Sequence, residues 1–116
     1  ASGATHFYLN VGRGTFTAVN GNNNDIDTDE NAFVRISGPT AAFTITGVTN
    51  TASAKAVTLY NSVAQDMTLA NENTNSTDTN RILTLTGADI VLTGVSVARL
   101  QYDSTDKRWI LLGTQG

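Results

Sequence analysis

The chain has 116 residues, a net charge of −3 and no cysteine. This length suits a single domain with a real hydrophobic core, so neither disulfides nor a structural metal is needed for folding. The acidic balance argues against a nucleic-acid-binding protein, which normally carries a basic surface, and no apolar run is long enough to cross a membrane. Only 15% of the residues are charged, while Thr and Asn occur 19 and 12 times.

Apolar residues alternate with polar ones, mostly Thr, along much of the chain. A period of two predicts β-strands with one buried and one exposed face. Gly-containing turn sequences separate the segments at the spacing of a sandwich or barrel. The predicted strands are Thr5–Asn10, Thr15–Val19, Ala32–Ile36, Ala42–Thr46, Lys55–Tyr60, Asp66–Ala70, Arg81–Thr86, Ile90–Leu92, Val95–Tyr102 and Arg108–Leu112.

These elements predict an all-β protein with one domain at residues 11–116, preceded by an N-terminal arm at residues 1–10. We expect a single antiparallel β-sandwich or flattened barrel, of the jelly-roll or β-tulip kind, with about eight to ten strands. The last two strands should form a hairpin closed by residues 103–107. Two polar stretches, Asn20–Asn31 and Asn71–Asn80, are predicted to be exposed loops.

Three carboxylates in the first polar stretch, Asp25, Asp27 and Asp29, form an Asp-x-Asp-x-Asp run. Alternating carboxylates can bind a hard cation, and the run resembles the start of an EF-hand loop. However, Glu30 occupies the position of the required Gly, and Ile36 occupies that of the bidentate Glu. The three residues are therefore weak metal candidates, and a solvated acidic turn is the alternative.

Catalytic signatures are sparse. His6 is the only histidine, cysteine is absent and no Gly-x-Ser-x-Gly motif occurs, so a nucleophile with an activating base is hard to assemble. We expect neither an enzyme nor a cofactor. Gly12-Arg13-Gly14 lacks the spacing of a phosphate-binding loop.

Arginine occurs inside or at the mouth of predicted apolar strands, where charged residues are unusual. The planar guanidinium of Arg suits carboxylate partners at an interface. Trp109 and Tyr102 can seal the core or, with Tyr60, form a sugar-stacking platform, and the core interpretation is the stronger one. The residues that we select as candidates for subunit contacts are Arg35, Arg81, Arg99 and Trp109.

The second half of the chain, from Lys55 to Gly113, carries a series of short motifs in a characteristic order. They are Gln65–Glu72, Asn80–Ile82, Gly87–Asp89, Leu100–Asp103 and Lys107–Trp109. This series resembles β-rich structural domains of tailed bacteriophages, found in head decoration proteins, head fibres and tail-fibre tips. The resemblance implies a virion protein, usually a homotrimer, that is made in the host cytoplasm.

A chain of this length, taken as a whole gene product, fits a capsid decoration (cement) protein. Such a protein binds the major capsid protein on the capsid exterior as a trimer and stabilises the DNA-filled head. The expected capsid anchor is the N-terminal segment Thr5, His6, Phe7, Tyr8 and Leu9, which has strand character and can add to an exposed sheet edge. The four subunit-contact candidates are equally candidates for capsid contact.

The alternative is the receptor-binding tip of a phage head or tail fibre, which is favoured if the chain is an excised fragment. In that case we expect an exposed aromatic and acidic patch, formed by Asn20–Glu30 with Tyr60, to recognise a host glycan. No nucleic acid or membrane is expected as a partner in either case.

Overall fold

The computed structural model describes residues 12–50 and 56–116 of the chain. This part forms ten β-strands and one turn of 3-10 helix, η1 (Asp78–Asn80), and it contains no α-helix. The all-β prediction is confirmed. No helix in the described ranges is long and apolar enough to span a bilayer. The N-terminal arm, including the strand predicted at Thr5–Asn10, lies outside the described residues.

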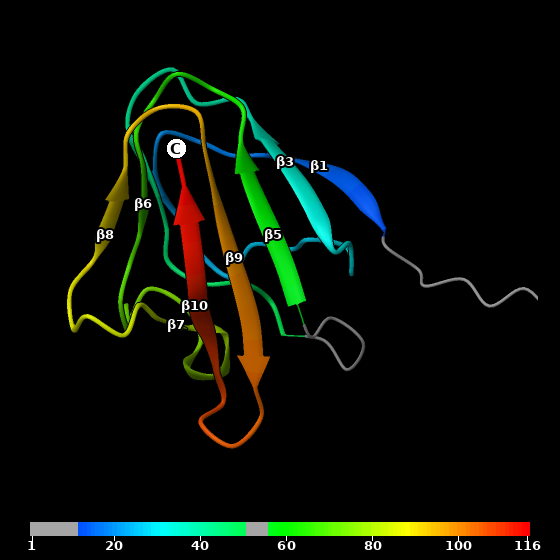
Figure 1. The fold of residues 1–116 in the computed structure, drawn as a ribbon, viewed down its shortest axis with the longest axis vertical. Helices are drawn as coiled ribbons and strands as arrows, with labels where there is room; N and C mark the ends of the chain where they lie inside the picture. Colours follow the sequence, from blue (N-terminus) through cyan, green and yellow to red (C-terminus); the bar gives the residue numbers. More distant parts are fainter. Residues whose placement is uncertain (1–11, 51–55) are drawn as a thin grey trace, which may run out of the picture.

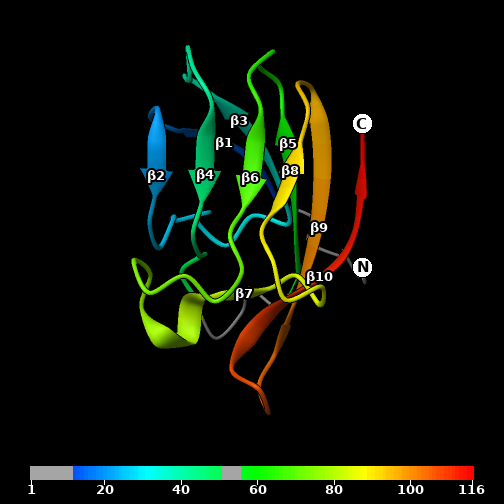
Figure 2. The same cartoon turned by 90° about the vertical axis from the view of Figure 1, so that its left-hand side faces the viewer.

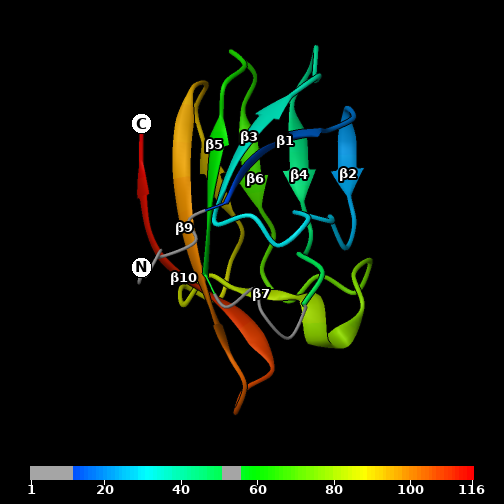
Figure 3. The ribbon, with the colours of Figure 1, turned by 90° about the vertical axis from the view of Figure 1, so that its right-hand side faces the viewer.

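The strands form two sheets that face each other (Figures 1, 2 and 3). The larger sheet contains, in spatial order, β1 (Arg13–Thr17), β3 (Phe33–Ser37), β5 (Ala56–Asn61), β9 (Ser96–Asp103), β10 (Arg108–Gln115) and β7 (Ile82–Leu83). The smaller sheet contains β2 (Gly21–Asn23), β4 (Phe43–Ile45), β6 (Met67–Leu69) and β8 (Ile90–Leu92). Figure 2 shows the smaller sheet face on.

The first six strands stack like the coils of a β-solenoid. The chain passes alternately through the larger and the smaller sheet, and β1, β3 and β5 run parallel, as do β2, β4 and β6. Arg13 lies opposite Phe33, and Phe33 lies opposite Thr58, so successive coils are 20 and 25 residues long. The prediction of a single antiparallel sandwich or barrel is therefore wrong. Alternation shows which side chains face inward, but it does not distinguish parallel from antiparallel neighbours.

The C-terminal strands close one end of this stack. β8 pairs antiparallel with β6, β9 pairs antiparallel with β5, and β10 forms the predicted hairpin with β9. At the other end, β1 and β2 are the edge strands of the two sheets within the described residues. The coil stack is therefore closed by antiparallel strands at its C-terminal end and ends in parallel edge strands at its N-terminal end.

The core lies between the two sheets. Inward residues of both sheets, such as Ile36, Phe43, Leu59 and Met67, are almost completely buried. Trp109 on β10 is fully buried, its indole N–H donates to the Val48 carbonyl at 2.9 Å, and its ring meets Tyr102 edge-on with centroids 5.2 Å apart. The core interpretation of this tryptophan is confirmed.

The polar stretch Asn20–Asn31 is only partly the exposed loop that the sequence predicts. It contains β2, and within it Asn23, Ile26 and Thr28 are buried. The Asn23 side-chain amide pairs with the backbone of Val19 as a neighbouring peptide group would. Its oxygen accepts the Val19 N–H at 2.9 Å, and its NH₂ donates to the Val19 carbonyl at 3.0 Å. Asn is therefore used here as a turn-closing side chain.

Candidate binding face on the larger sheet

The outer face of the larger sheet carries two neighbouring rows of side chains that cross the strands. Exposure alternates along β1, β3, β5 and β9, so every second residue points away from the core. Strand register places Arg13, Phe33, Thr58 and Arg99 in the first row. The second row contains Thr15, Arg35, Tyr60 and Val97.

Arg35 and the two aromatic rings contact one another within these rows. The guanidinium carbon of Arg35 lies 5.4 Å from the centre of the Tyr60 ring, within the range of a cation–π interaction. The Phe33 and Tyr60 rings are 6.1 Å apart and tilted by 37°. These contacts restrict three large side chains before any ligand binds, which lowers the entropic cost of binding. We call the surface formed by Arg13, Phe33, Arg35, Tyr60 and Arg99 the Arg–aromatic face.

The charge of this face is opposite in sign to that of the whole chain. In the described ranges Arg81 and Arg108 form ion pairs, whereas the three arginines of the Arg–aromatic face take part in none of these pairs. None of the ten Asp and Glu residues lies in the two rows. Three positive charges are thus displayed on a protein whose net charge is −3, and this favours a negatively charged ligand or partner.

Two shallow hollows lie on this face, one on each side of Phe33. The first, about 400 Å³, is lined by Arg13, Thr15, Phe33 and Arg35. The second, about 290 Å³, is more apolar, and Phe33, Arg99 and Leu112 contribute to its wall. The face can therefore bind a partner through charge-assisted hydrogen bonds from planar guanidinium groups, combined with apolar contact to the rings.

The Asp-x-Asp-x-Asp run does not converge on one point. Asp25 faces the polar stretch 71–80, where its Oδ1 accepts hydrogen bonds from the Thr77 backbone N–H at 2.8 Å and from the Asn80 amide at 2.9 Å. Asp27 instead accepts the N–H of Asp29 at 2.8 Å within its own turn. In residues 12–50 and 56–116, no group of three or more His, Cys, Asp or Glu side chains is placed to hold a metal ion.

The environment of Asp25 shows what its carboxylate does in the folded chain. Partial burial alone would raise its pKa, but hydrogen bonds from Asn80, Thr77 and Ser76 outweigh burial, and the pKa of Asp25 is lowered. The ionised form is thus favoured by donors that belong to another loop. Asp25 joins the turn after β2 to the stretch that precedes β7, which is a structural role.

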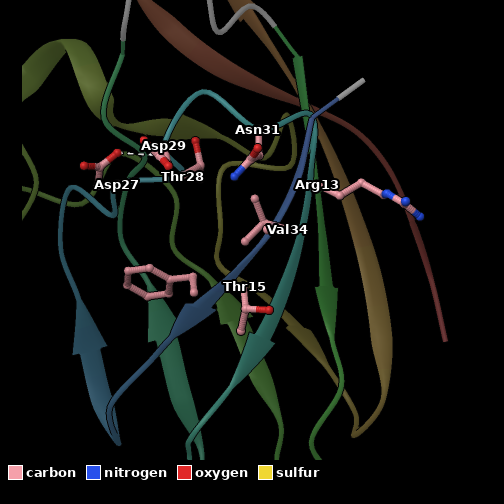
Figure 4. A pocket seen from close by; sticks show the side chains of 9 residues that line it. Arg13, Thr15, Asp27, Thr28, Asp29, Asn31 and Val34 are labelled. Carbon is pink, nitrogen blue, oxygen red and sulfur yellow. Dashed lines mark hydrogen bonds between the residues drawn. The ribbon is translucent and has the colours of Figure 1, made fainter. Parts of the chain in front are cut away.

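A third hollow, of about 260 Å³, lies beneath the edge strand β1 (Figure 4). Its lining includes Thr28, Asn31 and Val34 together with the carboxylates of Asp27 and Asp29. Figure 4 shows Arg13 pointing away from these carboxylates, toward the outer side of β1. Because the Arg13 guanidinium and the two carboxylates point in different directions, we assign no ligand to this hollow.

The structure brings together only part of the interface candidates chosen from the sequence. Arg35 and Arg99 share the Arg–aromatic face, whereas Arg81 donates to the Ser76 carbonyl at 3.0 Å and pairs with Asp78. Trp109 is in the core, so it contributes no surface. Thr5, His6, Phe7, Tyr8 and Leu9 lie outside the described residues, and the proposed capsid anchor stays a prediction.

Neighbouring ionisable groups at the start of β10 form a structural cluster. Arg108 pairs with Glu72 and Asp78, and the hydrogen bond that its guanidinium donates to the Glu72 carboxylate is the main reason why the pKa of Arg108 is raised. Burial is the main reason why the pKa of Tyr102 is raised. This cluster joins β10 to the loop carrying η1, which is a structural role.

Sequence reasoning missed Arg13 and Phe33 as members of the binding face. It also placed Tyr60 in one patch with Asn20–Glu30, but Tyr60 lies on the larger sheet and β2 lies on the smaller one. The alternation of apolar and polar residues did predict which side chains point away from the core, since Phe33, Arg35 and Ser37 are alternate residues of one strand. The alignment of β1, β3, β5 and β9 that assembles the face could not be predicted from the sequence, because it depends on the long-range register between these strands.

Comparison of the chain with protein-family models, with curated proteins and with solved structures finds no match. The Arg–aromatic face is therefore interpreted from its own chemistry.

Proposed function

We propose that this protein is a non-enzymatic structural protein of a bacteriophage particle, a capsid decoration protein that binds the capsid exterior and stabilises the DNA-filled head. The observation that carries the proposal is the Arg–aromatic face, which we assign as the docking surface for an acidic region of the major capsid protein. Interface cores are enriched in Arg, Tyr and Phe and depleted in Lys, Glu and Asp. The two rows have this composition.

The mechanism of such a protein is adhesion. Arg35 supplies a planar donor fork that is already positioned by the Tyr60 ring, and carboxylates on the capsid supply acceptors for bidentate pairing. A homotrimer presents three copies of the face, and the second and third contacts then form at a high effective concentration. Modest contacts repeated in this way resist the outward pressure of packaged DNA.

The proposal keeps residues 1–10 as a second anchor, through strand addition by Thr5–Leu9 to the capsid protein. Synthesis in the host cytoplasm and final location on the virion exterior follow from the same proposal. Among the described strands, β1 is an edge strand of the larger sheet and pairs only with β3, so its outer side is a second position at which a strand of a partner can add.

The test is binding of purified protein to undecorated heads, comparing Arg35→Glu with Lys107→Glu. Both substitutions reverse one charge, but Arg35 lies on the Arg–aromatic face and Lys107 lies in the exposed turn between β9 and β10. We expect Arg35→Glu to weaken binding at least about tenfold, the loss of roughly 1.4 kcal/mol expected for an interface arginine. Lys107→Glu should bind like the parent, and equal binding of both variants would contradict the assignment.

A receptor-binding fibre tip is the second candidate, and the Phe33–Tyr60 ring pair beside Arg35 is the observation that favours it. Exposed rings can stack on sugar faces while arginines bind acidic substituents. A glycan array distinguishes the two functions. Binding of acidic glycans that Arg35→Glu abolishes, without any binding to heads, would support the tip and not the decoration protein.

A further inference from the structure

Leu85, in the loop between β7 and β8, combines two unusual properties. Its φ angle is +69°, in the left-handed region that bulky side chains rarely adopt. Its side chain is also 69% exposed, the largest value among the exposed large hydrophobic residues of the described ranges. A strained backbone that holds an apolar side chain in solvent is a reason to look for a function at that position.

The loop that carries Leu85 is held rigidly by side-chain hydrogen bonds. The Thr84 hydroxyl donates to the Ala88 carbonyl at 2.6 Å, and the Thr86 hydroxyl donates to the same carbonyl at 3.0 Å. At the end of the loop, Asp89 accepts the Asn71 N–H at 2.8 Å. Because hydrogen bonds hold both neighbours of Leu85, the loop projects this residue from a defined backbone position, and the pre-ordered loop reduces the entropic cost of inserting Leu85 into a partner.

A complementary cavity exists on another side of the same molecule. The more apolar hollow of the larger sheet, about 290 Å³ in volume, is lined by residues that include Phe33, Ala56, Arg99 and Leu112. Leu112 is itself 61% exposed, at the irregularity in the β9–β10 pairing between Leu111 and Gly113. The charges also match, since Asp89 is the only charged residue of the Leu85 loop and Arg99 lies in the wall of the hollow.

We infer that Leu85 of one copy inserts into this hollow of a second copy of the same chain, with Asp89 facing Arg99. The Leu85 loop and the hollow are different surfaces of the chain, so the contact between two copies is heterologous. Such contacts form a closed ring of three subunits when each subunit is rotated by one third of a turn relative to its neighbour. The inference rests on the proposed homotrimer and specifies its subunit contact. It also divides the Arg–aromatic face, because Arg99 contacts the neighbouring subunit while Arg13 and Arg35 remain available to the capsid.

Disulfide cross-linking tests the contact in a chain that has no cysteine of its own. The double variant Leu85→Cys with Leu112→Cys should form, on mild oxidation, a covalent species of three chains on a non-reducing gel. The matched control is Val91→Cys with Leu112→Cys, because Val91 is 59% exposed but lies outside the Leu85 loop. The control should stay a single chain. Cross-linking of the Leu85 pair no stronger than that of the control overturns the inference.

A second measurement avoids new covalent bonds. In analytical ultracentrifugation, Leu85→Lys should raise the concentration at which half of the trimer dissociates at least about tenfold, since it places a positive charge in an apolar hollow that already has Arg99 in its wall. Val91→Lys should leave this concentration unchanged, and unchanged circular dichroism verifies that both variants fold. A Leu85→Lys trimer as tight as the parent overturns the contact. A monomeric parent protein that still decorates heads overturns the contact and leaves the proposed function standing.

Discussion

Replacing Asp25 by Ala should destabilise the fold although Asp25 is only half-buried. The carboxylate accepts three hydrogen bonds from the loop that leads to β7: two from Thr77, at 2.8 and 3.2 Å, and one from Asn80 at 2.9 Å. At the low end of the range for hydrogen bonds in a partly solvated site, their loss costs about 2 kcal/mol. Asp25 also has a φ of +47°, which Ala tolerates less well than Asp, and this adds about 0.5 kcal/mol.

Urea unfolding measures this difference directly, because the midpoint should fall while the slope stays constant. Asp106→Ala removes the same charge from the exposed turn after β9 and should change stability by less than about 0.5 kcal/mol. The pKa of Asp25 is lowered in the folded chain. The ionised carboxylate therefore contributes its full share to the free energy of unfolding above the pKa of the unfolded chain, about 3.9, and this share is lost as the pH falls through the lower pKa of the folded chain. An Asp25→Ala variant as stable as Asp106→Ala at pH 7 would refute this reasoning.

Two further substitutions test buried polar contacts. Trp109→Phe removes the donor to the Val48 carbonyl and leaves both an unpaired buried acceptor and a small cavity, so we expect a loss of about 3 kcal/mol in chemical denaturation. Asn61→Ala deletes donors to the carbonyls of Gln65 at 2.8 Å and Gly94 at 2.9 Å from a fully buried amide. Its melting temperature should drop by roughly 10 °C, corresponding to about 2–3 kcal/mol, and an unchanged value would show that water replaces the amide.

Most strands could be predicted from the sequence because alternation reports directly which residues leave water. Phe33–Ser37, for example, differs by one residue from the predicted Ala32–Ile36. β2 was missed because its residues are Gly, Asn and Asn, and the buried one, Asn23, is stabilised by amide hydrogen bonds that have no hydrophobic signature. The coil stacking was missed because the coils differ in length and share no repeated motif.

The binding face was only partly predictable for a related reason. Arg35 and Arg99 stood out as charges within apolar strands, and both point outward because the neighbouring residues Val34 and Leu100 point inward. Arg81 had the same local appearance, yet it forms an ion pair beside η1. Trp109 was selected as an aromatic interface candidate, yet it fills the core. The register between β1, β3, β5 and β9 decides which side chains share a face, and it is a long-range property.

Quantitative mass spectrometry of purified DNA-filled heads determines whether this is a decoration protein. The proposed function predicts that the protein co-purifies with heads at a copy number comparable to that of the major capsid protein, and that Arg35→Glu removes it from the particle while Lys107→Glu does not. Heads that lack the protein, or that carry it only at the few copies expected of a vertex or fibre component, would contradict the proposal.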